Sequence, residues 1–173
     1  MFSSYRAEDV TILLKDITGC IDPLPTAERE RLIQSGHHYS EMLPLEYEPT
    51  EKYLEAYADA LARYAGITAQ ATARLAEQIY AEKGADAALV SLARAGTPIG
   101  ILLKHYIRQR FGADVAHYTI SIIRGRGIDA NAMDYILARH APAAVQFVDG
   151  WTGKGAIQRT LAEAAAPYAG LSA

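Results

Sequence analysis

The sequence predicts an α/β protein with a mostly parallel sheet and a helical N-terminal layer. Short β-rich runs alternate with helical patterns in residues 84–173, an order typical of parallel strands joined by crossover helices. Residues 1–83 instead hold one strand-like run and three helical patterns. Half of the 173 residues are hydrophobic and 21% are charged, which is the composition of an ordinary globular protein.

In the first division, residues 1–83, the β-rich run 10–14 predicts a strand. Thr26 is the expected N-cap of a helix that ends near Gly36. Thr50 and Gly66 are expected to bound a second helix, and a third is predicted over 68–84.

Tyrosines recur at helical spacing in the second of these helices. We expect Tyr57 and Tyr64 to pack in the core, because apolar residues at this spacing usually mark a buried helix face. The alternative is a lid or a partner surface on the tyrosine-rich first half.

The second division, residues 84–173, is expected to form the α/β core. The runs 87–92, 118–123 and 143–148 predict parallel strands. Helices are expected from Thr97 to about Phe111, over 131–140 and over 154–166. Three strands make a small sheet, so either the run 10–14 adds a strand or the natural protein continues past residue 173.

Composition excludes several classes of function. Asp and Glu outnumber Lys and Arg by 20 to 17, a net charge of −3, which argues against a partner that is nucleic acid. The single cysteine, Cys20, excludes an internal disulfide and a multi-cysteine metal site. No apolar run is long enough to span a membrane, and no signal peptide is visible, so we expect a cytoplasmic protein with no membrane partner.

Three loops are expected beyond the carboxyl ends of the strands, where open parallel sheets bind ligands. The first contains Arg94, Ala95, Gly96 and Thr97, the second Arg124, Gly125, Arg126 and Asp129, and the third Asp149, Gly150, Trp151, Thr152, Gly153, Lys154, Gly155 and Ala156. Glycines free the backbone to wrap an anion, arginines bind phosphate oxygens, and free amides of a helix start favour negative charge. Each loop also has a simpler interpretation as an ordinary turn or cap, with Thr97 and Asp129 as capping residues.

A phosphorylated ribose or nucleotide is therefore the predicted small-molecule partner, held where the three loops converge. The third loop is not a Walker motif, because Gly155 stands where a magnesium-binding Ser or Thr would be. No side-chain cluster predicts a direct metal site, although Asp149 could reach a metal ion through water. The sequence leaves open whether the protein forms a homo-oligomer.

The third loop resembles the phosphoribosyl-pyrophosphate loop of type I phosphoribosyltransferases. A closer resemblance covers nearly the whole chain and is carried by the segments 39–42, 95–100, 122–129 and 147–155. These segments resemble a bacterial phosphoribosyltransferase-like family associated with tellurium resistance and stress, which is also labelled cysteine protease StiP.

The resemblance implies a type I phosphoribosyltransferase-like, Rossmann-like core. It also implies an enzyme that binds phosphoribosyl pyrophosphate with Mg²⁺ and transfers phosphoribose to a nitrogenous base. Asp149, Arg124 and Arg126 would then be the catalytic residues.

Two alternatives belong to other classes. A cysteine hydrolase would need Cys20 as nucleophile and His37 or His38 as base, or an active site outside this chain. Cys20 lies in a Pro-rich turn without a strand-to-helix elbow, so we interpret it as an incidental loop residue. The other alternative is a nucleotide-binding module without catalysis.

Overall fold

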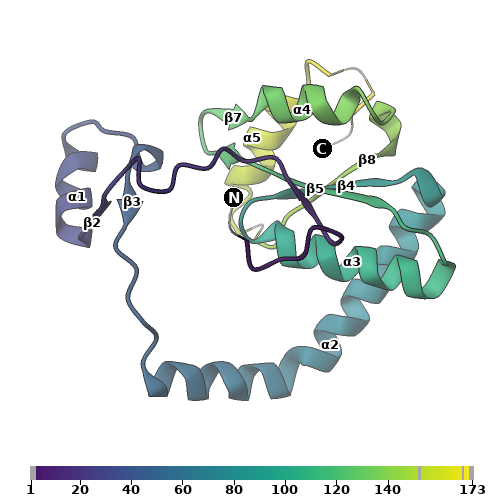
Figure 1. Ribbon diagram of the computed structural model, residues 1–173, viewed down its shortest axis with the longest axis horizontal. Helices are drawn as coiled ribbons and strands as arrows, with labels where there is room; N and C mark the ends of the chain where they lie inside the picture. Colours follow the sequence, from purple (N-terminus) through teal and green to yellow (C-terminus); the bar gives the residue numbers. More distant parts are fainter. Residues whose placement is uncertain (1–2, 152, 169, 172–173) are drawn as a thin grey trace. The chain divides into compact units, whose positions relative to one another are not determined.

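The structure is a computed structural model that describes residues 3–151, 153–168 and 170–171. Within these residues the main sheet has four strands in the order β1-β5-β4-β8, all parallel (Figure 1). The strands are β1 (Thr11–Ile12), β4 (Ala88–Leu92), β5 (Ala116–Ile120) and β8 (Val145–Val148). The mixed α/β class with a mostly parallel sheet is confirmed, and the N-terminal run supplies the fourth strand.

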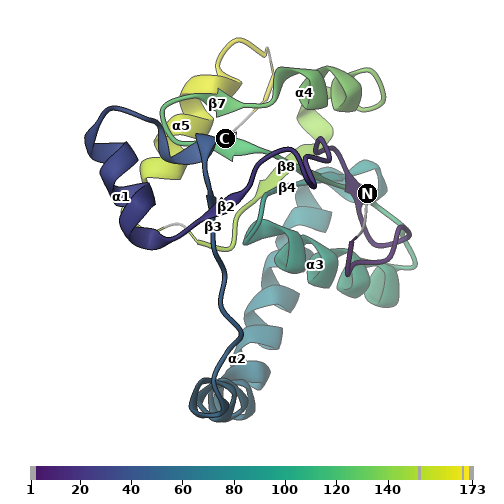
Figure 2. The same ribbon diagram turned by 60° about the vertical axis from the view of Figure 1, so that its left-hand side comes forward.

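Helices cover both faces of this sheet (Figures 1 and 2). On one face, Val90 and Ile120 pack against Met133 of α4 (Ala130–Leu137) and Leu161 of α5 (Ala156–Ala165). The opposite face packs Leu89, Val115 and Val148 against α3 (Gly96–Phe111) and the last turns of α2 (Glu51–Lys83). All five residues of β4 are buried, which explains why this strand is a continuous apolar run rather than an alternating one.

The predicted strand 118–123 is wrong at its carboxyl end. The chain leaves the main sheet at Ser121, and β6 (Ile122–Ile123) pairs antiparallel with β7 (Gly127–Ile128) instead. The amide of Asp129 donates to the carbonyl of Ser121 at 3.2 Å, so the segment turns back on itself. The hairpin packs on α5, where the position of a Cβ on Gly127 lies 3.3 Å from the Ala164 methyl carbon.

Another correction concerns Gly66, which was expected to end a helix. A single helix, α2, runs from Glu51 to Lys83 through this residue. A glycine within a helix costs only about 1 kcal/mol relative to alanine, and helix-forming residues on both sides outweigh that cost. Thr50 does cap the helix as expected, because its hydroxyl accepts from the amide of Tyr53 at 3.3 Å.

By contact density the chain divides into two units, Met1–Leu14 with Ile67–Ala173, and Lys15–Gly66. This division differs from the sequence-based one at residue 83, because the first strand joins the sheet and α2 contributes to both units. The unit 15–66 also contains β2 (Pro23–Leu24), α1 (Thr26–Gln34), the 3-10 turn η1 (Tyr39–Glu41) and β3 (Leu43–Pro44). Its strands β2 and β3 are parallel.

Two expectations in this unit are wrong. Pro25, not Thr26, occupies the N-cap of α1, and no side chain caps that helix. Tyr57 and Tyr64 were expected in the core, yet each exposes 60% of its surface.

Among the described residues, no helix combines the length and hydrophobicity needed to cross a lipid bilayer.

Helix α3 approaches the sheet most closely at Gly100, and we predict that Gly100→Ala destabilises the protein. A Cβ at this position would lie 2.2 Å from His117 Nε2 and 2.3 Å from Ser91 Oγ, both of which are buried. Overpacking of this kind costs about 1–3 kcal/mol, so the melting temperature should fall by roughly 3–10 °C.

Gly66→Ala is the matched control, because nothing lies within 4 Å of a Cβ at that position and the residue is within a helix. This change should raise the free energy of unfolding by about 0.5–1 kcal/mol. Thermal melts followed by circular dichroism measure both variants. Equal melting temperatures for the two variants would contradict the close approach at Gly100.

Candidate functional site

The first and third predicted loops touch at the carboxyl edge of the sheet. A Cβ on Gly96 would lie 2.2 Å from the carbonyl oxygen of Val148, and one on Gly150 would lie 2.3 Å from the carbonyl oxygen of Ala95. Both glycines are therefore required by backbone-to-backbone packing. The parallel register of β4 and β8 brings these two loops together.

The first loop leads from β4 into α3, and its peptide bond between Ala93 and Arg94 is cis. Arg94 is exposed, and Ala95 occupies the N-cap of α3 without a side-chain hydrogen bond. The expected role of Thr97 as the cap is wrong. Its side chain is buried, with its hydroxyl oxygen 2.8 Å from that of Thr119 on β5.

The second loop is the turn of the β6–β7 hairpin rather than a direct extension of a main-sheet strand. Arg124, Gly125 and Arg126 are exposed at this turn. Asp129 caps α4, because its carboxylate accepts from the amides of Asn131 and Ala132 at 2.9 and 3.2 Å. Asp129 is therefore a helix cap, as the simpler interpretation of this loop predicted.

The third loop follows β8 and ends at the N-cap of α5. Asp149 is half-buried, whereas Trp151 exposes 77% of its surface and Lys154 is exposed. Gly153 and Gly155 have φ angles of 42° and 75°, which disfavour any other residue. Helix α5 begins at Ala156, two residues later than expected. Thr152 lies outside the described residues.

Sequence reasoning missed a pocket of about 360 Å³ beside the first loop. It is lined by Ser3, Ser4 and Tyr5 from the N-terminal segment and by Arg94, Thr97 and Thr119, among others. The strand-like run 10–14 could have indicated this pocket, because a parallel strand formed by that run places the residues next to it at this edge of the sheet. Among the described residues, no group of three or more His, Cys, Asp or Glu side chains could hold a metal ion.

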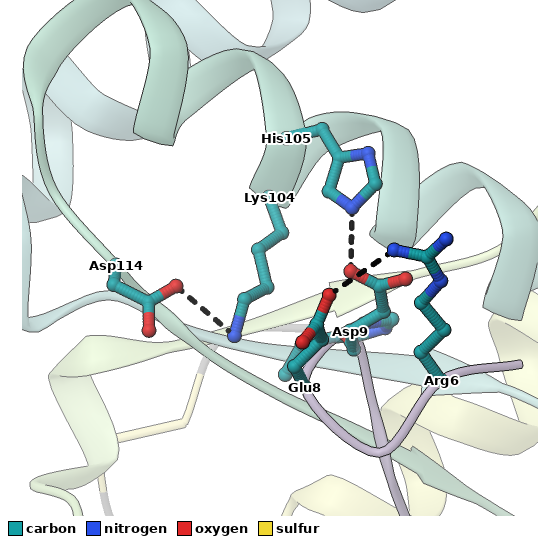
Figure 3. A network of polar contacts seen from close by, with 7 residues as sticks. Arg6, Glu8, Asp9, Lys104, His105 and Asp114 are labelled. Carbon is teal, nitrogen blue, oxygen red and sulfur yellow. Dashed lines mark hydrogen bonds and ion pairs between the residues drawn. The ribbon is translucent and has the colours of Figure 1, made fainter.

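Polar contacts hold the N-terminal segment against α3 and the sheet (Figure 3). His105 Nε2 donates to the Asp9 carboxylate at 2.5 Å, and this hydrogen bond lowers the pKa of Asp9 below its ordinary value. The ammonium of Lys104, one residue before His105, reaches Asp114 at 3.2 Å. Arg6 and Glu8 form an exposed ion pair at 3.4 Å in the same segment.

His117 on β5 lies beneath this segment and is buried. Its Nδ1 is 2.8 Å from the carbonyl oxygen of Asp9, which can only accept, so Nδ1 carries the proton. Nε2 of the neutral ring then accepts from the hydroxyl of Ser91, 2.8 Å away. The same hydroxyl is 3.0 Å from the carbonyl oxygen of Gly96 and donates to one acceptor at a time. Burial lowers the pKa of His117, because the charged ring would lose its hydration.

The unit 15–66 carries the thiol. Cys20 is free and exposed, and it closes a tight turn in which its amide donates to the carbonyl of Ile17 at 2.9 Å. Gly19 before it has a φ of 76°, and the amide of Thr18 donates to the Asp16 carboxylate at 3.0 Å. The turn therefore fixes the backbone on which the thiol is presented.

Both histidines considered as bases belong to the same unit. His38 is half-buried, and its Nδ1 lies 2.7 Å from the hydroxyl of Ser40 and 3.3 Å from the Ser40 amide. Its ring contacts Tyr39, with the centroids 4.6 Å apart. His37 is exposed, and its Nδ1 lies 3.3 Å from the hydroxyl of Ser35. His38 is thus the more firmly oriented of the two.

Comparison with known proteins gives the family. The family described as tellurite-like stress resistance cysteine protease StiP matches residues 3–173. The chain belongs to this family. A curated relative named cysteine protease StiP, from Acinetobacter baylyi (strain ATCC 33305 / BD413 / ADP1), is 50% identical over 159 residues. The match covers 91% of this chain and 41% of that relative. No solved structure matches the chain.

The StiP family confirms the resemblance and corrects the function drawn from it. The expected phosphoribosyltransferase activity is wrong, because the family and the relative are both named for a cysteine protease. The cysteine hydrolase alternative agrees with these names. The expected phosphorylated ligand and Mg²⁺ stay predictions.

We predict that the stability of the fold decreases with falling pH through His117. The folded state holds the pKa of this residue below the ordinary value of about 6.5, so the unfolded state binds more protons in the acidic range. Stability contributed by the neutral ring is full above about pH 6.5 and is lost as the pH falls towards the folded-state pKa. Asp9 acts in the same direction at lower pH, because its folded-state pKa is also depressed.

The measurement is the urea midpoint of unfolding between pH 5 and pH 7.5 for the wild type and for His117→Gln. The glutamine cannot titrate, so its midpoint should depend less on pH than that of the wild type. An identical dependence in both proteins would show that protonation of His117 is not coupled to folding.

Proposed function

We propose that this chain supplies the nucleophile of a cysteine protease and that the nucleophile is Cys20. The observation that carries this proposal is that this chain of the StiP family has one cysteine among its 173 residues, exposed on a tight turn. A thiol nucleophile must be reachable by substrate, and Cys20 meets this requirement. The chain spans about two fifths of the length of the curated relative it matches.

The register of β2 and β3 supports His38 as the base. Pro23 pairs with Leu43 and Leu24 with Pro44, and the two strands are parallel. Cys20 lies three residues before Pro23, and Ser40 lies three residues before Leu43. Segments that precede adjacent parallel strands lie at the same end of the pair. The Cys20 turn and the His38–Ser40 segment therefore share that end.

The chemistry follows from these two groups. His38 would take the proton of the Cys20 thiol, and the thiolate sulfur would attack the carbonyl carbon of the scissile peptide bond. The protonated imidazole would return the proton to the leaving amine, and water would then hydrolyse the thioester.

In the structure the Ser40 amide donates to Nδ1 of His38, so the neutral ring carries its proton on Nε2. To take the thiol proton on Nε2, the ring would first carry its own proton on Nδ1 and donate it to the Ser40 hydroxyl, 2.7 Å away, in place of the bond from the amide. Ser40 would then act as a positioning residue.

We also propose the finer fold, a type I phosphoribosyltransferase-like core, as the scaffold of this protein without its transfer chemistry. The parallel order β1-β5-β4-β8 and the contact between the first and third loops support it. The pocket beside Arg94 would then serve as a binding surface at the sheet edge. An experimental structure compared with that fold tests the assignment.

We predict that Cys20→Ala abolishes peptide cleavage. His38→Gln should lower it by about 10²–10⁴-fold, the usual contribution of a positioned acid–base group. His37→Gln, the matched control, should change it by less than about threefold, because His37 is not the group oriented at the end of the strand pair. The assay is mass spectrometry of a casein digest over time, with the wild type and each variant.

Thermal melts of each variant show whether the fold is kept. Cleavage that survives Cys20→Ala in a folded protein would place the nucleophile outside this chain and end the proposal. If His37→Gln loses cleavage and His38→Gln keeps full activity, Cys20 would remain the nucleophile and His37 would be the base.

A further inference from the structure

Another pocket, of about 430 Å³, lies at the amino ends of the main-sheet strands, opposite the edge where the first and third loops meet. Five alanines and four polar residues line this amino-end pocket, and the polar residues are Asp86, Asp114, Arg139 and His140. We propose that it binds a free amino acid. All of its lining residues belong to the unit that contains residues 67–173, and the proposal does not rest on the protease activity.

The register of the sheet brings two carboxylates to this pocket. Ala88 of β4 pairs with Ala116 of β5. Asp86 and Asp114 each precede one of these alanines by two residues, so they approach the same end of neighbouring parallel strands. The ammonium of Lys104 lies 3.2 Å from the Asp114 carboxylate and neutralises it. The Asp86 carboxylate has no hydrogen-bond or ion-pair partner among the described residues, so its charge is left for a ligand.

The segment between α4 and β8 supplies hydrogen-bond donors. The Arg139 guanidinium lies over the Tyr135 ring, with its central carbon 3.5 Å from the ring centroid, and Nη1 donates to the Tyr135 carbonyl at 2.8 Å. Its other N–H groups remain as donors. Tyr118 is buried, and its hydroxyl lies 2.8 Å from His140 Nε2. Because a buried hydroxyl donates to the acceptor it reaches, the neutral His140 ring carries its own proton on Nδ1, which is a second donor.

Charge identifies the ligand. With Asp114 paired to Lys104, Asp86 and Arg139 are the charged lining residues without a counter-ion among the described residues, and they have opposite signs. A ligand with one charge would satisfy one of them and be repelled by the other. An amino acid offers its ammonium to Asp86 and its carboxylate to Arg139 and to Nδ1 of His140. Both contacts are charge-assisted hydrogen bonds, which are the strong ones.

The size of the pocket and the spread of its polar groups favour a molecule over a single ion. Within the part of the chain that the structure describes, no three His, Cys, Asp or Glu side chains are grouped to hold a metal ion. Sites for small molecules usually have volumes of about 300–1,000 Å³, and the amino-end pocket lies within this range. Because the alanines offer methyl groups, we expect an aliphatic side chain on the ligand, and L-leucine is the probe.

The test is a titration of the isotope-labelled chain with L-leucine, followed by two-dimensional amide NMR spectra. Leucine should shift the amide signals of Asp86, Asp114 and His140 with a Kd below about 10 mM, as expected for a ligand of this size. Isoamylamine lacks the carboxylate of leucine, and isocaproate lacks its ammonium. Each should bind at least about tenfold more weakly than leucine, because each loses charge-assisted hydrogen bonds.

Two variants separate the two ends of the ligand. Arg139→Gln should weaken leucine binding by at least about tenfold and make isoamylamine bind as well as leucine. Asp86→Asn should weaken leucine binding as much and make isocaproate bind as well as leucine. Arg74→Gln and Glu163→Gln are the matched controls, because they remove the same charges at exposed positions outside the pocket, and they should leave the affinity unchanged. Dispersed amide signals show that each variant is folded.

Three results would overturn the inference. The first is no amide shift with leucine, or shifts confined to residues outside the amino-end pocket. The second is the same leucine affinity in the pocket variants as in the control variants. The third is isocaproate or isoamylamine binding to the wild type as tightly as leucine, which would make the ligand a simple anion or a simple amine.

Discussion

Helix α3 can lie against the sheet only because Gly96 and Gly100 have no side chains. A Cβ on Gly96 would meet the carbonyl of Val148, and one on Gly100 would meet His117 and Ser91. This close approach positions the first loop against the third and encloses the imidazole of His117. It also sets α3 beside the N-terminal segment, where His105 binds Asp9 and fixes the first strand at the edge of the sheet.

The parts of the fold that local sequence encodes were predictable. The strands β4 and β8 are uninterrupted apolar runs, and their parallel order follows from the alternation with helices. The break at Ser121 was not predictable, because the residues on both sides of it are equally β-branched. The Asp9 contacts with His105 and His117 join residues 96 and 108 positions apart, and no local pattern records such pairs.

The candidate site shows why a loop motif can identify a family and mislead about its chemistry. Glycines at 96 and 150 permit backbone contacts, Thr97 bonds to Thr119, and Asp129 caps a helix. Such residues are recognisable in sequence because the fold needs them, whatever ligand is bound. The thiol, in contrast, lies in a turn without any repeated pattern, and only membership of the StiP family draws attention to it.

The first strand, β1, has two residues and covers one side of β5. Such a short edge strand exposes few unpaired backbone groups, and therefore offers little template to another unfolded or partly folded chain. Beneath it, β5 has five residues, four of them buried. Detachment of the N-terminal segment would turn this longer, β-rich strand into the sheet edge. The hydrogen bonds of Asp9 thus protect the protein against aggregation as well as unfolding.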